Sequence, residues 1–155
     1  MKVPAVLRKV VNAVRPGRGR LQVAALPYRR RSDGSYEVLL VTTRGTGRWM
    51  VPKGWPMFGK SYAEAAAQEA YEEAGVRGTT NPVELGRFDH EKSRFPDAAL
   101  HCTVAVFAMP VEQELTRWPE RGQRTRRWFS VEEAAQAVQS PNLASIIAAV
   151  EQRAA

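Results

Sequence analysis

Three glutamates on one short segment have the types and spacing to do chemistry together. Glu69, Glu72 and Glu73 stand at i, i+3 and i+4, and side chains at this spacing share one face of an α-helix. Carboxylates crowded in this way repel one another unless a cation lies among them. Their oxygens are the ligands that Mg²⁺ prefers. The spacing therefore makes these residues candidates for a metal site, with a solvated charged face as the alternative interpretation.

The surrounding sequence predicts the element that would hold these carboxylates. Ser61 and Glu64 fit a capping box, so we expect a helix to begin near Ser61. Gly75 supplies the left-handed residue that often ends a helix, and the predicted helix therefore has about three and a half turns. A Pro/Gly-rich loop, residues 52–56, precedes it and excludes regular helix or central strand there. Small residues on the other face would allow close packing on a sheet; they are Ala63, Ala66, Ala67, Ala70 and Ala74.

The segment from Gly54 to Val76 resembles the Nudix box, the signature G-x5-E-x7-R-E-U-x-E-E-x-G-U in which U is apolar. Gly54 matches the first glycine, and residues 69–76 match the distal half in register. Two positions depart from the signature: Lys60 replaces the early glutamate and Gln68 replaces the arginine.

This resemblance implies a catalytic metal site. Glu72 and Glu73 would be the main ligands, Glu69 a further ligand or base, and the Gly54 carbonyl an additional oxygen ligand. The implied cofactor is Mg²⁺, with Mn²⁺ as the alternative. The implied reaction is attack of water on a pyrophosphate, for which positioning and charge stabilisation supply most of the catalysis.

Features outside the box are similar to the diphosphoinositol polyphosphate phosphohydrolase branch of the Nudix family. They lie at residues 39–44, 48–54, 118–119 and 126–129. This branch acts on diphosphoinositol polyphosphates and diadenosine polyphosphates, which are small polyanions that need many cations. Arg44, Arg48 and Lys53 are the predicted phosphate-binding residues. The weaker candidates are Lys92, Arg94, Arg124 and Arg126.

Two other functions compete with this interpretation. One is hydrolysis of other nucleoside diphosphate derivatives, such as ADP-ribose, or of phosphates at an RNA 5′ end. The net charge permits RNA, but the sequence lacks an aromatic-lined RNA-binding motif, which disfavours a nucleic-acid partner. The other is a non-catalytic module that binds phosphorylated ligands, suggested by Lys60 and Gln68. Retention of all three glutamates favours the enzyme.

Composition bounds the compartment and the domain count. The 155 residues predict one domain, residues 21–155, preceded by a basic arm or short helix at residues 1–20. A formal net charge of +7 favours polyanionic ligands. One cysteine excludes an internal disulfide and makes the cytoplasm the predicted location. The sequence contains no apolar run long enough to span a membrane, and it leaves the oligomeric state open.

Patterning predicts an α/β fold. Strands are expected over residues 21–28, 36–42, 83–90, 98–108 and 124–129, and helices follow at residues 131–138 and 142–151. Residues 91–97 are expected to form a loop. This order agrees with a single-domain α/β/α sandwich with a mixed sheet, the fold that the Nudix resemblance implies.

Overall fold

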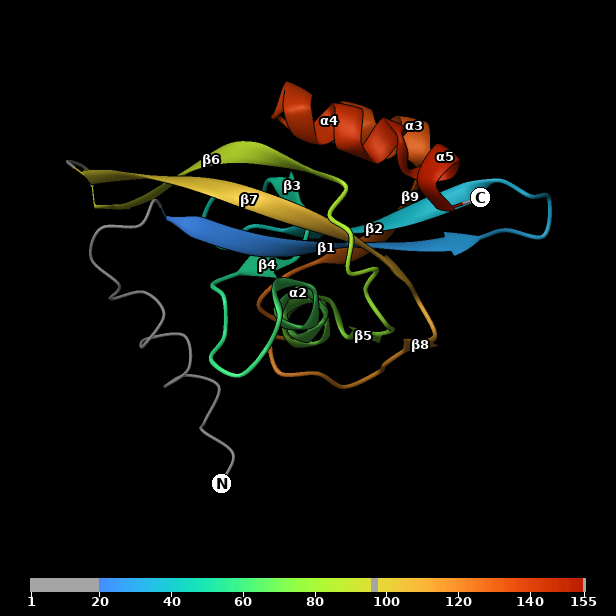
Figure 1. Cartoon of the computed structure of the whole chain (residues 1–155), viewed down its shortest axis with the longest axis horizontal. Helices are drawn as coiled ribbons and strands as arrows, with labels where there is room; N and C mark the ends of the chain where they lie inside the picture. The colour runs from blue at the N-terminus through green and yellow to red at the C-terminus, as the bar shows by residue number, and fades with distance from the viewer. Residues whose placement is uncertain (1–19, 96–97, 155) are drawn as a thin grey trace.

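The computed structural model describes residues 20–95 and 98–154 and shows a sheet with helices on both faces. Helix α2 (Tyr62–Glu69) lies on one face. Helices α3 (Val131–Ala137), α4 (Pro141–Ala148) and α5 (Val150–Ala154) lie over the other (Figure 1). This confirms the predicted α/β/α sandwich. The basic arm predicted at residues 1–20 falls almost entirely outside the described residues.

The sheet is mixed, as predicted. Its main path runs β3-β2-β1-β7-β6, with β4 on β1 and β9 on β2. The β1–β7 pair is parallel and the other pairs are antiparallel. The strands are β1 (Leu21–Arg30), β2 (Tyr36–Thr42), β3 (Trp49–Met50), β4 (Lys53–Gly54), β6 (Gly86–Phe95), β7 (Ala98–Pro110) and β9 (Arg126–Ser130). A separate small sheet pairs β5 (Val76–Arg77) with β8 (Gln113–Glu114).

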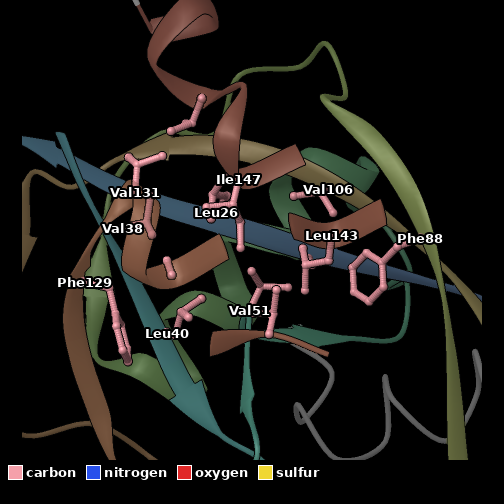
Figure 2. Close-up of a cluster of buried hydrophobic side chains, with 14 of the residues drawn as sticks. Leu26, Val38, Leu40, Val51, Phe88, Val106, Phe129, Val131, Leu143 and Ile147 are labelled. Carbon is pink, nitrogen blue, oxygen red and sulfur yellow. The ribbon is translucent and has the colours of Figure 1, made fainter. Parts of the chain in front are cut away.

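Strand β1 is apolar on both faces because both faces are covered. Val23 and Ala25 join the cluster under α2, whereas Ala24 and Leu26 join the cluster under α3 and α4. Figure 2 shows the second cluster, in which Leu26, Phe88 and Leu143 are among the side chains that meet from several strands and helices. Hydrophobic packing therefore covers both faces of the sheet, and the site is built on the face that α2 covers.

The helix that follows the Pro/Gly-rich loop begins as predicted. Ser61 Oγ accepts a hydrogen bond from the Glu64 N–H, and Glu64 Oε1 accepts one from the Ser61 N–H, which completes the capping box. Gly75 ends the segment in the left-handed conformation, with φ of 65°. Between them the structure differs from the prediction, because α2 stops at Glu69 and residues Ala70–Ala74 form a π-helical turn, η1.

One further expectation needs correction. Residues 91–95 are strand and not loop, because the β6–β7 ladder continues past His90↔Cys102 to Ser93↔Ala99. Backbone pairing thus extends through a polar stretch that lacks a strand pattern in the sequence. The Pro/Gly-rich loop also contains a two-residue strand, β4, which pairs with β1.

Candidate functional site

Glu69 lies against the chain that precedes its helix. It is fully buried, and a Cβ added to Gly54 would overlap the Glu69 carboxyl group. Gly54 pairs with Val23, whose side chain belongs to the α2 side of the sheet. The absence of a side chain at Gly54 therefore makes the space that the Glu69 carboxylate occupies.

Glu73 lies one turn further along the same face and is also buried. Its Oε2 accepts a hydrogen bond from the Lys53 N–H at 3.3 Å, and its Oε1 lies 3.2 Å from Arg124 Nη2. Burial raises the pKa of Glu73 to about 7, although the positive charges of Arg124 and Lys53 pull it down. Glu120 adds a nearby negative charge that raises this pKa further. The carboxyl group therefore gives up its proton with difficulty when no metal is bound.

Glu72, the third glutamate of the segment, is buried as well. The Gln68 amide donates a hydrogen bond of 3.4 Å to Glu72 Oε1. Gln68 stands where the Nudix signature has arginine, so a neutral donor serves Glu72 at this position. Lys60, the other departure, lies in the turn before the Ser61 cap. The pKa of the Glu64 carboxyl group is lowered mainly by its hydrogen bonds with Ser61, and the positive charge of Lys60 lowers it further.

Arg124 comes from a distant part of the chain and was only a weak candidate in the sequence. Its guanidinium contacts Glu73, lies 3.3 Å from Glu120 Oε1, and donates a hydrogen bond to the Thr42 carbonyl at 3.1 Å. Glu120 was not predicted at all, because no local motif distinguishes it. It lies in a polar connection whose sequence has no regular pattern, so the sequence alone did not mark it as a site residue.

The predicted phosphate-binding residues occupy three places. Arg44 is exposed on the loop after β2, and its Nη1 donates a hydrogen bond to Gln123 Oε1 at 3.0 Å, beside Arg124. Arg48 is exposed at the foot of the same loop, where its backbone bonds to Thr43. Lys53 lies on β4, next to Gly54. Arg44 and Arg124 thus lie close together at one rim of the site.

The remaining weaker candidates have other positions. Arg126 donates hydrogen bonds to the backbone carbonyls of Ala74, Gly75 and Leu115. Lys92 and Arg94 belong to β6, and their side chains lie outside the described residues.

The carboxylate oxygens of these glutamates are the kind of ligand that a divalent cation such as Mg²⁺ prefers. Two carboxylates, Glu69 and Glu73, contact the Lys53–Gly54 strand, and Glu72 lies on the same helical segment. In the described part of the chain, however, no three His, Cys, Asp or Glu side chains are arranged as a ready metal site. Glu73 is instead engaged by Arg124, which supplies a positive charge there. Metal binding by these residues stays a prediction.

Comparison with known proteins identifies the family. Residues 20–150 match the family model described as NUDIX domain. The chain therefore belongs to the Nudix family, and it is a hydrolase of the type that acts on phosphoanhydride bonds.

Two relatives illustrate the range of similar sequences. The chain is 34% identical over 136 residues to Nudix hydrolase 16, mitochondrial, of Arabidopsis thaliana, covering 79% of this chain and 74% of that protein. It is 37% identical over 112 residues to diphosphoinositol polyphosphate phosphohydrolase 3-alpha of Mus musculus, covering 70% of this chain and 64% of that protein.

Solved structures share the fold. The Ap4A hydrolase of C. elegans has a TM-score of 0.63 at 16% identity, covering 89% of this chain and 100% of that one. The NUDIX domain of Shewanella oneidensis NrtR, complexed with ADP ribose, has a TM-score of 0.64 at 16% identity, covering 99% of this chain and 100% of that one. At these identities the likeness concerns the fold alone.

A methyl group at Gly54 should disrupt the site without unfolding the protein. In Gly54→Ala the new Cβ must displace the Glu69 carboxyl group, and we expect hydrolysis to fall about 10- to 100-fold, as when the support of a metal ligand is lost. Circular dichroism should remain that of the wild type. Gly86→Ala is the control, because its methyl group meets only the flexible end of Ile146. Equal activity of the two variants would contradict the proposed role of Gly54.

The raised pKa of Glu73 predicts a pH-dependent stability in the absence of metal. Because the folded-state pKa of about 7 exceeds the ordinary 4.5, the stabilising contribution of the protonated group is complete below pH 4.5 and is lost as the pH rises through 7. In EDTA, the free energy of unfolding of the wild type should therefore fall by about 3 kcal/mol relative to Glu73→Gln between these limits. Urea titrations at several pH values measure the difference. A flat difference would show that Arg124 keeps Glu73 ionised throughout.

Proposed function

We propose that this protein is a divalent-metal-dependent pyrophosphohydrolase that cleaves phosphoanhydride bonds of diphosphoinositol polyphosphates or dinucleoside polyphosphates. The observation that carries the proposal is the burial of Glu69, Glu72 and Glu73 on one segment, with two of them against the Lys53–Gly54 strand. Burying three acids together is costly unless cations compensate. A site that takes up divalent metal with its substrate would supply those cations.

The charge around the site supports a substrate rich in phosphate. Arg44 and Arg124 lie at one rim and Lys53 lies beside the acids, and guanidinium groups bind phosphate oxygens through paired hydrogen bonds. The formal net charge of +7 attracts polyanions over longer distances. The relative named diphosphoinositol polyphosphate phosphohydrolase 3-alpha, at 37% identity, favours the same class of substrate.

Each residue then has a role in the proposed reaction. Glu72 and Glu73 would be the main ligands of Mg²⁺, or of Mn²⁺, with Glu69 as a further ligand or base and the Gly54 carbonyl as an additional ligand. When bound, the metal would neutralise phosphate charge and lower the pKa of water. Arg44, Arg48 and Lys53 would orient the phosphates. The Gly54 backbone would keep the Glu69 carboxylate in place.

The location of the protein stays a prediction. In the described residues, every helix is too short or too polar to cross a membrane. The single cysteine favours the cytoplasm, whereas Nudix hydrolases 16 and 12 of Arabidopsis are named as mitochondrial. A small phosphorylated metabolite as partner is compatible with either compartment.

A substrate panel tests the proposal. The panel contains a diphosphoinositol polyphosphate, diadenosine hexaphosphate, diadenosine tetraphosphate and ADP-ribose, assayed for product release with Mg²⁺ and with EDTA. We expect turnover of the first two only with Mg²⁺, and we expect Glu73→Gln to reduce it by orders of magnitude. Glu132→Gln, an exposed position on α3, makes the same chemical change as a control.

Each outcome of the panel has a distinct meaning. Hydrolysis of ADP-ribose alone would keep the phosphoanhydride chemistry and contradict the proposed substrate. Glu73→Gln with wild-type turnover would remove Glu73 from the site. Turnover in EDTA would contradict the metal dependence.

Arg44 should contribute to binding more than to the chemical step. Its exposed guanidinium lies at the rim and donates a hydrogen bond to Gln123. Arg44→Ala should therefore raise KM several-fold while kcat changes little, the pattern of uniform binding. Arg87→Ala removes an exposed arginine that is paired with Glu84 and should change neither constant. A loss confined to kcat in Arg44→Ala would contradict the assignment.

A further inference from the structure

Residues 115–126 hold the end of the box helix, which is the continuous helical segment that α2 and η1 form. These residues lie far from that helix in the sequence. The last carbonyls of a helix lack partners within the helix. Here the Glu120 N–H donates to the Glu72 carbonyl at 3.0 Å, and the Leu115 N–H donates to the Gly75 carbonyl at 2.8 Å. The turn that carries Glu72 and Glu73 is therefore bonded from outside the helix.

Arg126 is the centre of this contact. Its Nη1 donates to the carbonyls of Ala74, at 2.9 Å, and Gly75, at 3.2 Å, and its Nη2 donates to the Leu115 carbonyl at 2.7 Å. One guanidinium thus joins the helix end to the segment that covers it. Its positive charge also lies where the helix dipole is negative.

Trp118 packs against both Arg126 and Gly75. The Arg126 guanidinium carbon lies 4.0 Å from the centre of the Trp118 ring. The ring packs directly on Gly75, so that any Cβ at Gly75 would overlap it. Gly75 therefore serves two needs: it adopts the left-handed conformation, with φ of 65°, and it leaves room for the indole.

The segment that these bonds hold departs from an α-helix. Its last turn is the π-helical turn Ala70–Ala74, which contains Glu72 and Glu73. Single π-helical turns are frequent at functional sites.

We propose that Arg126 is a positioning residue: by binding the carbonyls of Ala74, Gly75 and Leu115 it fixes the π-helical turn that presents Glu72 and Glu73 to the metal. The inference rests on the proposed function, since it assumes that these glutamates bind metal. Arg126 acts through the backbone, since its hydrogen bonds go to the carbonyls of Ala74, Gly75 and Leu115. Its Nη2 also lies 3.7 Å from Glu114 Oε1. Its planar fork of donors reaches several carbonyls at once, which a lysine ammonium does less well.

The test measures metal binding apart from catalysis. Mn²⁺ alone is titrated into the metal-free protein, and the free ion is followed by electron paramagnetic resonance. The constants kcat and KM are measured separately, with the panel substrate that the wild type hydrolyses fastest. In Arg126→Ala we expect the Kd for Mn²⁺ to rise and kcat to fall, each by about 10- to 100-fold, with KM within about threefold. Arg126→Lys should recover part of both losses.

Arg127→Ala is the matched control. Arg127 is the next residue on the same strand, more exposed, and its guanidinium lies over Phe129, which belongs to the cluster on the α3 and α4 side of the sheet. The Arg127→Ala variant should bind Mn²⁺ with the same affinity as the wild type. If Arg126→Ala and Arg126→Lys also keep wild-type Mn²⁺ affinity and kcat, and only their melting temperatures fall, Arg126 is a structural residue and the proposal is wrong.

A second pair of variants decides the matter if Arg126→Ala does not fold. Gly75→Ala would push Trp118 away, whereas Gly34→Ala introduces similar left-handed strain in the β1–β2 turn, where its Cβ would have ordinary contacts. Weaker Mn²⁺ binding in Gly75→Ala than in Gly34→Ala supports the proposal, and equal binding overturns it. A wild type that neither binds Mn²⁺ nor hydrolyses any panel substrate would instead overturn the proposed function, and the inference with it.

Discussion

The rest of the structure is arranged around three carboxylates that are buried on one helical segment. Glu69, Glu72 and Glu73 are nearly or fully buried, and an unpaired buried charge is among the most unfavourable features that a protein can contain. The protein compensates with backbone and side-chain donors: the Lys53 N–H and Arg124 reach Glu73, and the Gln68 amide reaches Glu72. This compensation is partial, since burial still raises the pKa of Glu73 to about 7. A bound cation would complete it.

The topology brings the necessary groups to the helix from two other parts of the chain. Strand β4 pairs with β1 and so holds Gly54 and the Lys53 N–H against Glu69 and Glu73. Strand β9 pairs with the other side of β2, and this pairing returns residues 115–126 to the end of the box helix. The cluster under α3 and α4 supports the sheet from behind (Figure 2). The acids are thus positioned by long-range sheet pairing more than by their own helix.

Local signals predicted the parts of the site that are local. The Ser61 cap, the left-handed Gly75 and the shared face of the glutamates all follow from short spacings, and the structure confirms the first two directly. The contacts of Arg124 and Arg126 could not be predicted, because they join residues that are about fifty positions apart in the sequence. The π-helical turn was also not predicted, because the capping box and Gly75 mark only the two ends of the helix. The strand at residues 91–95 was not predicted, because its pairing with β7, and not its own composition, determines its conformation.

One departure from the Nudix signature, Gln68, has an electrostatic interpretation. Gln68 removes a positive charge from the helix face and leaves Glu72 with a neutral donor. Positive charge reaches the acids from elsewhere instead: Arg124 contacts Glu73 directly, and Lys53 is close enough to lower its pKa. Arg124 belongs to residues 115–126, which also donate hydrogen bonds to the carbonyls at the end of the helix. The same segment therefore supplies the positive charge beside Glu73 and holds the turn on which Glu73 lies.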